Sequence, residues 1–439
     1  MMRDYDIVIV GAGPAGLAAA HAAASSGARI AVVDDNPFAG GQIWRGGPQH
    51  AQDQRAPRLW SALQQCRNVD FLQRTRVGAA PDERTLLAET PDGALALRFG
   101  KLIIATGARE RLLPFPGWTL PGVTGAGGLQ ALVKGGFPVA GKRVVVAGSG
   151  PLLLAVAATL REKGAVVVAI LEQAPLRKLA GFGLSLGLTP SKLTQALALR
   201  RALAGIPYLF DAWVTAAEGD GTVRQASYRH GGTVRKIACD LLACGYGLVP
   251  NTELAGMLGC RLRDRTVDVD AMQQTSVPGI YCAGEGTGIG GVDLSLAEGR
   301  IAGLAASGQG EAARADMAAR ERWRGFARRL ARTFALRDEL RMLSSADTLV
   351  CRCEDVRYGD LATHGSWRSA KLHTRCGMGA CQGRICGGAT EILFGWTQDS
   401  VRLPLAPMRI GSLVTGGAAA AGEGCAISDA SAARDTRSA

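Results

Sequence analysis

The sequence has few aromatic residues and no long apolar run. Phe, Trp and Tyr make up 5% of its 439 residues, which argues against a stacking surface for single-stranded nucleic acid. It contains no stretch of 18 uninterrupted apolar residues, so we expect no membrane-spanning helix. The net charge of +12 comes largely from arginine and would suit an acidic protein or anionic lipid headgroups, but it decides nothing about chemistry. We therefore predict neither a nucleic-acid partner nor a membrane span.

Histidines are scarce as well, and the cysteines do not suggest disulfides. None of the five histidines stands in an acid–base grouping, so we predict no catalytic residue on this chain. The apolar run near the N-terminus is broken by glycines and preceded by Asp4 and Asp6, unlike a signal peptide. Five of the eleven cysteines fall between Cys351 and Cys386. Such clustering without a secretory signal favours a metal in a reducing compartment, the cytoplasm.

A nucleotide-binding signature occupies the N-terminal region. The stretch DIVIVGAGPAGLAAAHAAASSGARIAVVDD predicts strand, turn, helix and strand. Gly11 would permit the sharp turn, Gly13 the approach of a pyrophosphate, and Gly16 the packing of helix on strand. Asp34 ends the second strand eighteen positions after Gly16, where its carboxylate can accept both ribose hydroxyls. The stretch predicts a dinucleotide site.

Two later segments indicate which dinucleotide binds there. One is an apolar strand ending in Ala-Thr-Gly (residues 101–117), and the other is a strand that leads into a glycine-rich turn with Glu285 (residues 275–291). Together with the first motif they resemble the two-dinucleotide-binding-domain flavoproteins, the glutathione-reductase-like superfamily. The resemblance implies FAD at the first site, with Glu285 on the ribityl chain where Asp is the commoner residue. Its implied cofactor contacts are Gly11, Gly13, Pro14, Ala15, Gly16, Asp34, Asp35, Gly41, Gln42, Val77, Ala105, Thr106, Gly107, Gly284 and Glu285.

A second glycine motif follows strand 144–146, with Gly148 and Gly150 as candidate cofactor contacts. Leu153 replaces the third glycine, so the helix must move away from the strand or find a compensating gap. Glu172 ends the next strand, where it would disfavour a ribose 2′-phosphate. The unit predicts a second nucleotide-binding fold but leaves its use open between NAD(H), a structural NAD or ATP, and an empty site.

The sequence disfavours a disulfide reductase. Such enzymes pass electrons through a CxxC or CxxxxC pair beside the flavin, and no such pair occurs at a suitable place. Cys239 and Cys244 flank one strand, and we expect them to pack in the core.

A basic helix is expected within residues 309–345. Trp323, Phe326, Leu330 and Phe334 recur at three- and four-residue steps and form one apolar stripe. The other faces carry arginines, which predicts a solvated linker helix packed on its own domain. The alternative is a surface for an acidic partner or membrane headgroups. These arginines are Arg320, Arg322, Arg324, Arg328, Arg329 and Arg332.

The clustered cysteines form two close pairs, Cys351 with Cys353 and Cys376 with Cys381. Four thiolates in two pairs suit a [2Fe–2S] cluster, and the glycines between them allow backbone N–H groups to face its sulfurs. Structural zinc sites usually show CxxC knuckles instead, so zinc is the less favoured alternative. Cys386 is a fifth thiol and leaves the ligand set ambiguous.

The words CRCEDV and TRCGMGACQGR resemble the domain first known from bacterioferritin-associated ferredoxin. Fused to a flavoprotein carrying GWTLPGV, AGGLQ and AGSGPLLLAVA, this domain resembles the alpha subunits of heteromeric amino-acid and opine dehydrogenases. That family includes the A subunits of octopine and nopaline oxidases, the B subunit of hydrogen cyanide synthase and the alpha subunit of D-hydroxyproline dehydrogenase. The resemblance covers residues 1 to roughly 410 and places the four paired cysteines on the family's cluster positions.

The resemblance also implies partners. A D-amino-acid-oxidase-like flavoprotein beta subunit would oxidise the C–N bond of an amino acid, imino acid or opine. An FMN at the interface with that partner and a small ferredoxin-like gamma subunit are further candidates. A quinone acceptor would add a peripheral contact at the inner membrane face.

We expect an α/β protein made of a two-dinucleotide-binding-domain flavoprotein and a small, mainly helical [2Fe–2S] domain. The predicted parts are the FAD-binding domain (1–117 and 266–308), the NAD(P)-binding-like domain (118–265), the basic linker helix (309–345), the cluster domain (346–410) and a disordered tail (411–439). The leading hypothesis is an electron-transferring subunit. A self-sufficient NADH-dependent reductase and a redox- or iron-sensing binding module are the alternatives.

Overall fold

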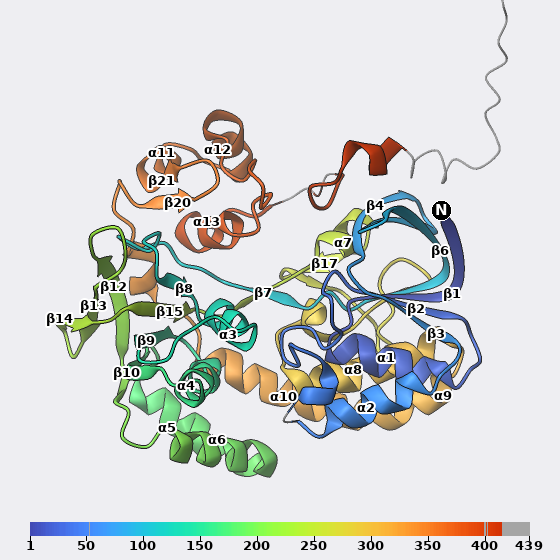
Figure 1. Cartoon of the computed structure of the whole chain (residues 1–439), viewed down its shortest axis with the longest axis horizontal. Helices are drawn as coiled ribbons and strands as arrows, with labels where there is room; N and C mark the ends of the chain where they lie inside the picture. Colours follow the sequence, from blue (N-terminus) through green and yellow to red (C-terminus); the bar gives the residue numbers. More distant parts are fainter. Residues whose placement is uncertain (52, 399–400, 402, 415–439) are drawn as a thin grey trace, which may run out of the picture.

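The computed structural model describes residues 1–51, 53–398, 401 and 403–414. Two sheet domains lie side by side, and a small domain with three short helices sits above them (Figure 1). Within these residues no helix combines the length and the apolar character needed to cross a membrane.

The first domain is built on a seven-stranded sheet with the order β3-β2-β1-β6-β5-β4 and with β19 also paired to β6. The central strands run parallel, and β4, β5 and β6 pair antiparallel. The apolar run of β1 is buried because strands flank it on both sides and helices cover the sheet. The strands are β1 (Met2–Val10), β2 (Ile30–Val33), β3 (Val69–Leu72), β4 (Arg76–Asp82), β5 (Thr85–Thr90), β6 (Gly93–Ile104) and β19 (Ile280–Cys282).

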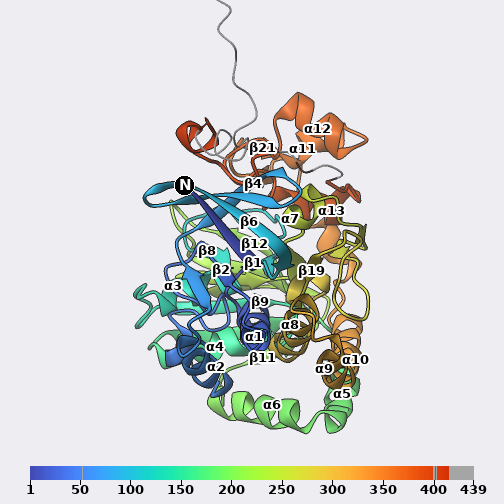
Figure 2. The same ribbon diagram turned by 90° about the vertical axis from the view of Figure 1, so that its right-hand side faces the viewer.

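Helices α1 (Pro14–Ala24) and α8 (Val292–Ala306) pack closely against each other (Figure 2). A Cβ added at Gly299 or Gly303 of α8 would stand 2.2 Å from the carbonyl oxygen of Ala15 or Ala19. The small residues of both helices therefore set their spacing. Helix α2 (Arg55–Gln64) lies beside α1.

The second domain has a five-stranded parallel sheet with the order β11-β10-β9-β15-β8. Leu153, at the place of the third glycine, is fully buried in its core. The elements are β8 (Val123–Gly125), α3 (Ala126–Lys134), β9 (Arg143–Gly148), α4 (Leu152–Glu162), β10 (Val166–Glu172), α5 (Leu176–Ser185), α6 (Pro190–Ala202), β11 (Tyr208–Phe210), the antiparallel strands β12 (Ala212–Glu218), β13 (Gln225–His230) and β14 (Thr233–Ala238), and β15 (Leu241–Gly245).

An antiparallel pair, β7 (Ala108–Glu110) and β16 (Leu248–Pro250), connects the two domains. Packing changes from one domain core to the other near this pair. Leu113 and Phe115 are buried in the second domain's core, whereas Leu254 and Ala255 of α7 (Glu253–Met257) are buried in the first. The apolar residues on the two sides of this pair therefore belong to different domain cores.

The linker contains α9 (Gly310–Ala313), α10 (Met317–Thr333) and a 3₁₀ turn, η5 (Asp338–Met342). Trp323 and Phe326 are buried against Phe182 of α5, as the apolar stripe predicts. Arg320 is only 6% exposed and donates a hydrogen bond to the Ala271 carbonyl oxygen. Arg324 forms an ion pair with Glu298 of α8, so these two arginines fix the helix to the first domain.

The small domain comprises β20 (Leu349–Cys351), β21 (Val356–Arg357), α11 (Tyr358–Ala362), α12 (Trp367–Thr374) and α13 (Cys386–Phe394). Residues 403–414 return to the first domain, where Leu405 joins the core and residues 410–414 form a helical turn. The predicted tail thus begins with an ordered turn, and residues 415–439 lie outside the described part of the chain.

Candidate functional site

The first glycine loop is sterically fixed for a dinucleotide. A Cβ at Gly11, whose φ is +109°, would stand 2.2 Å from the Ala105 carbonyl oxygen, and one at Gly16 would stand 1.8 Å from the Gly11 carbonyl oxygen. Around Gly13 the space is open except for the Cα of Gly41 at 3.9 Å. The loop thus presents bare backbone at the start of α1, where N–H groups and the helix dipole favour phosphate. Pro14 and Ala15 begin that helix.

Asp34 lies at the carboxyl end of β2, as predicted, and is 9% exposed. Its Oδ2 accepts a hydrogen bond from the Ala12 N–H of the glycine loop at 2.6 Å, and its Oδ1 accepts from Asn36. The carboxylate is therefore held beside the loop, where a ribose would lie. Burial, followed by the neighbouring Asp34 charge, raises the pKa of Asp35.

The Ala-Thr-Gly turn and the connection between the domains are bonded to each other. The Thr106 hydroxyl donates to the Asn251 carbonyl oxygen at 2.8 Å, and the Asn251 side-chain amide donates to the Thr106 carbonyl oxygen at 2.9 Å. Ala105 and Gly107 complete the turn, with φ +66° at Gly107. The turn thus sits where the two domains meet.

Glu285 follows β19, and its carboxylate accepts hydrogen bonds from the N–H groups of Gly290 and Gly291 at 3.3 and 2.9 Å. Burial raises the pKa of Glu285 to about 7, and those two bonds oppose the shift. The longer Glu side chain therefore reaches back to its own turn.

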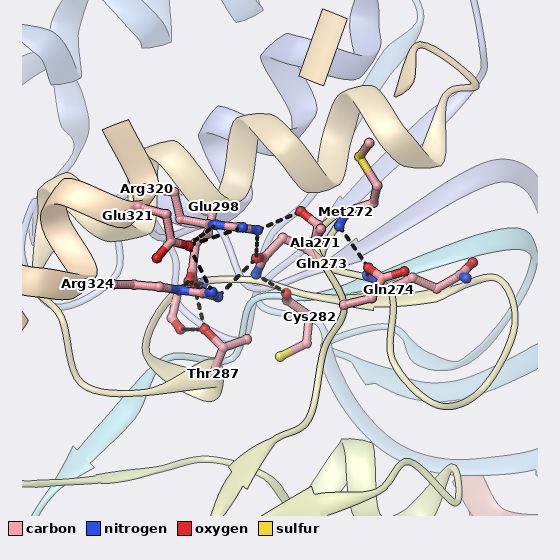
Figure 3. Close-up of polar contacts among 12 residues, drawn as sticks. Ala271, Met272, Gln273, Gln274, Cys282, Thr287, Glu298, Arg320, Glu321 and Arg324 are labelled. Carbon is pink, nitrogen blue, oxygen red and sulfur yellow. Dashed lines mark hydrogen bonds and ion pairs between the residues drawn. The ribbon is translucent and has the colours of Figure 1, made fainter. Parts of the chain in front are cut away.

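Glu298 of α8 is a structural residue that the sequence reasoning missed. It is 1% exposed, and Figure 3 shows it receiving hydrogen bonds from Arg324 at 3.0 Å and the Thr287 hydroxyl at 2.6 Å. The Gly284 N–H also donates to it at 3.1 Å. Glu298 therefore ties α10 to the turn that carries Gly284 and Glu285. An acidic residue within the apolar run of α8 is the sequence feature that could have identified Glu298.

Two predicted contacts lie at the edge of the site. Gln42 is exposed, and its Oε1 accepts from Arg45 at 2.6 Å. Val77 is half-buried on β4.

The second glycine loop differs from the first in backbone geometry, because Gly150 has φ +100° whereas Gly13 has φ −77°. Gly148 has φ +142°, and a Cβ there would stand 1.9 Å from the Gly245 carbonyl oxygen. Glu172 is completely buried, with one carboxylate oxygen accepting from the Gly150 N–H at 2.8 Å and the other from the Ala174 N–H at 2.9 Å. Burial raises the pKa of Glu172 to about 7 despite these bonds. Both of its oxygens are used within the protein.

The structure gathers the clustered cysteines in the small domain. The sulfur atoms of Cys351, Cys376 and Cys386 lie within 4.8 Å of one another, and all three residues are buried. Cys353 contacts both the backbone N–H and the thiol of Cys381, and these two residues lie nearer the surface. Cys386, the ambiguous fifth thiol, is thus part of the compact buried group.

The crowded thiols shift one another's pKa values. Hydrogen bonds from Cys376 and Cys386 lower the pKa of Cys351 to about 2, and the Cys351 thiolate raises the pKa of Cys376 to about 12. A cation bound at this group would favour the thiolate form of these residues.

Glycines bring the two cysteine loops together. A Cβ at Gly379 would stand 2.3 Å from the Cβ of Cys353, and one at Gly377 would stand 2.6 Å from the Trp367 ring. Arg375 forms an ion pair with Glu354 at 2.8 Å.

Arg109 of β7 links the cysteine loop to the Ala-Thr-Gly turn. Its Nη1 donates to Asn251 Oδ1 at 2.8 Å, and its Nε donates to the carbonyl oxygen of Arg384 at 3.0 Å. Arg384 lies between Cys381 and Cys386, and Asn251 is bonded to Thr106. A continuous line of hydrogen bonds therefore links the Ala-Thr-Gly turn to the cysteine loop.

Two nucleotide-binding folds joined by an antiparallel connection define an FAD-dependent oxidoreductase of the two-domain type. The family model of the pyridine nucleotide-disulphide oxidoreductases matches residues 5–313, and the chain belongs to that family. Cys239 and Cys244 are both buried in the second domain's core, as predicted.

Curated relatives match nearly the whole chain. The A subunit of the opine oxidase of Agrobacterium tumefaciens is 32% identical over 93% of this chain and 91% of its own length. Hydrogen cyanide synthase subunit HcnB of Pseudomonas protegens is 32% identical over 87% of this chain and 90% of its own length. These matches confirm the resemblance inferred from the motifs.

Among solved structures, L-proline dehydrogenase from P. horikoshii superposes with a TM-score of 0.65 over 94% of this chain and 80% of that chain, at 18% identity. Thioredoxin reductase of T. acidophilum superposes with a TM-score of 0.54 over 70% of this chain and 98% of that chain, at 25% identity. The first likeness supports the fold alone.

Proposed function

We propose that this chain is the electron-transferring subunit of a heteromeric enzyme that oxidises the C–N bond of an amino acid, imino acid or opine on a partner flavoprotein. The observation that carries the proposal is the cysteine group, seated on the connection between the two nucleotide-binding domains and bonded to it through Arg109. The relatives that are named as oxidase or synthase subunits support it.

FAD is proposed for the first glycine loop. Bare backbone at Gly13 and Gly41 and the carboxylate of Asp34 fit a pyrophosphate and a ribose. The turn with Thr106 and the turn with Glu285 would flank the rest of the cofactor.

A [2Fe–2S] cluster is proposed for the cysteine group, with Cys351, Cys353, Cys376 and Cys381 as ligands and Cys386 as a packed neighbour. Four soft thiolates from two loops fit its ligand demand, and the glycine-rich backbone leaves N–H groups free to approach its sulfurs. When bound, FAD would exchange electrons in pairs and the cluster singly, so the two together would couple two-electron and one-electron chemistry. We propose no catalytic acid or base on this chain.

The substrate pocket is proposed to lie on a D-amino-acid-oxidase-like beta subunit. An interfacial FMN, a ferredoxin-like gamma subunit, and peripheral contact with a quinone at the inner membrane face are compatible extensions. The chain would then act in the cytoplasm.

Anaerobic purification tests the cysteine assignment. We expect two irons and two labile sulfides per chain, with an electron paramagnetic resonance signal after reduction. Cys353→Ser should lose both iron and signal, whereas the matched variant Cys386→Ser should retain iron. Zinc in the wild-type protein, or iron retained in Cys353→Ser and lost in Cys386→Ser, would refute the ligand assignment.

Co-expression tests the partner. The chain should form a stable complex with a beta subunit, and the complex should reduce an artificial dye with an amino acid, imino acid or opine as donor. Dye reduction at the same rate by this chain alone would contradict the division of labour.

A further inference from the structure

The segment that follows α10 lies across the second nucleotide site. In sheets of this type a dinucleotide binds outside the carboxyl ends of the parallel strands, next to the glycine loop and the residue that ends the second strand. In this domain those ends are the loop after β9, Gln173 after β10, and Asp211 after β11. The chain passes over all three between residues 334 and 337.

The first contact is with the glycine loop itself. The Ser149 hydroxyl donates to the Phe334 carbonyl oxygen at 2.9 Å, and a Cβ at Gly150 would lie 3.8 Å from the Phe334 ring. That ring also packs edge-on against Phe182, with ring centroids 5.4 Å apart. Phe334 therefore lies at the loop on which a pyrophosphate would rest.

The second contact is with Gln173, next to the ribose position. Its side-chain amide donates to Ser149 Oγ at 2.9 Å and to the Ala335 carbonyl oxygen at 3.1 Å. Its Oε1 accepts from the Arg337 N–H at 3.2 Å. Every polar atom of the Gln173 side chain is thus bonded to the loop or to the segment.

The third contact is Arg337. Its guanidinium pairs with Asp211 at 2.7 Å, lies 3.6 Å above the Trp213 ring, and donates to the Gln173 carbonyl oxygen at 3.3 Å. It is held from several sides, and the segment continues into η5, where Leu340 is buried in the second domain's core.

The binding groups of this crevice are therefore satisfied within the chain. The Ser149 hydroxyl and the Gln173 side chain are both bonded to residues 334–337, at the glycine loop and beside the ribose position. We infer that Phe334–Arg337 fills the second dinucleotide crevice and is the specificity determinant that excludes nicotinamide nucleotides from this chain. Reducing equivalents would then enter from another redox group and not from NADH or NADPH. The inference holds with or without the iron–sulfur cluster.

Binding measurements on the full-length, flavin-loaded protein test it. Calorimetric titration of the wild type with NADH should show no saturable binding at millimolar concentration. Arg337→Ala and Phe334→Ala/Arg337→Ala remove the contacts at one and both ends of the segment. We expect NADH to bind both variants at least about tenfold more tightly than the wild type. The reason is that the state in which residues 334–337 have left the crevice becomes more populated. When NADH binds to the variants, the backbone amides within residues 148–153 should become protected from hydrogen exchange.

Arg332→Ala is the matched control, because Arg332 is exposed on the last turn of α10 and loses the same charge. It should behave as the wild type. Flavin absorbance and circular dichroism show which variants are folded, and the milder Arg337→Ala keeps the test usable should the double variant unfold. Saturable NADH binding to the wild type, or no gain in binding in either folded variant, would overturn the inference.

Discussion

At the scale of single residues, close backbone contacts decide where glycine is required. Gly16 is needed because α1 approaches the end of β1 so closely that any side chain would meet the Gly11 carbonyl oxygen. Leu153, at the equivalent place in the second loop, is fully buried in the second domain's core. The same motif thus has different steric requirements in the two domains.

Gly16→Ala should therefore damage the first site specifically. The new Cβ would stand 1.8 Å from the Gly11 carbonyl oxygen, so the loop and helix must separate. We expect bound FAD to fall at least about tenfold, with a loss of unfolding free energy of about 3 kcal/mol. The flavin-to-protein absorbance ratio and thermal unfolding measure both.

Gly310→Ala is the control, because a Cβ at Gly310 in α9 meets no atom within 4 Å. It should leave the flavin content unchanged. Full flavin occupancy in Gly16→Ala would show that the close packing at this loop is not required.

At the scale of elements, α10 is the piece that joins the domains. Its middle is fixed to the first domain by Arg320 and Arg324 (Figure 3), and the chain after it bonds to the second glycine loop through the Phe334 carbonyl oxygen. The helix and the residues after it therefore hold the two domains together. Arg324 balances the buried charge of Glu298.

Arg324→Ala tests this attachment of α10 to the first domain. The substitution would leave the Glu298 carboxylate buried without its cation, which costs on the order of 3 kcal/mol of unfolding free energy. The Gly284 turn should loosen as well, because Glu298 accepts its N–H. Chemical denaturation and FAD dissociation report the two effects.

Arg328→Ala removes an exposed arginine from the same helix and should change the unfolding free energy by less than about 0.5 kcal/mol. Equal stabilities for the two variants would mean that Arg324 does not neutralise Glu298 to any useful extent.

At the scale of the whole molecule, the chain returns from the small domain to the first one. Glu89 of β5 is buried and accepts from the Arg409 N–H at 2.8 Å and the Ser412 hydroxyl at 2.9 Å. Leu405 packs into the first core, and Arg76 donates to the Pro407 carbonyl oxygen. The small domain is therefore fixed at both of its ends.

This attachment should weaken in acid. Burial alone would raise the pKa of Glu89, but its hydrogen bonds to Arg409, Ser412 and Arg76 outweigh burial and lower the pKa to about 2 from an ordinary 4.5. A lowered pKa contributes stability above pH 4.5 that is lost as the pH falls from 4.5 towards 2. The hydrogen-exchange protection factors of residues 405–412, which correct for the pH dependence of intrinsic amide exchange, should fall over that window.

Glu89→Gln provides the comparison, since it cannot ionise. Its exchange in this segment should already be fast at neutral pH and should depend less on pH than in the wild type. An identical acid response in both proteins would place the titrating group elsewhere.

The two nucleotide-binding folds, the FAD loop and the clustering of the cysteines could all be predicted from the order of the residues. They follow from local patterns, in which glycine spacing, strand periodicity and neighbouring thiols need no distant residue to be recognised. The folded chain was needed to show that Cys386 lies beside Cys351, that Glu298 is the buried counter-ion of α10, and that the second crevice is filled by Phe334–Arg337. These contacts join residues far apart in the chain, and their energies depend on burial, which local patterns do not encode.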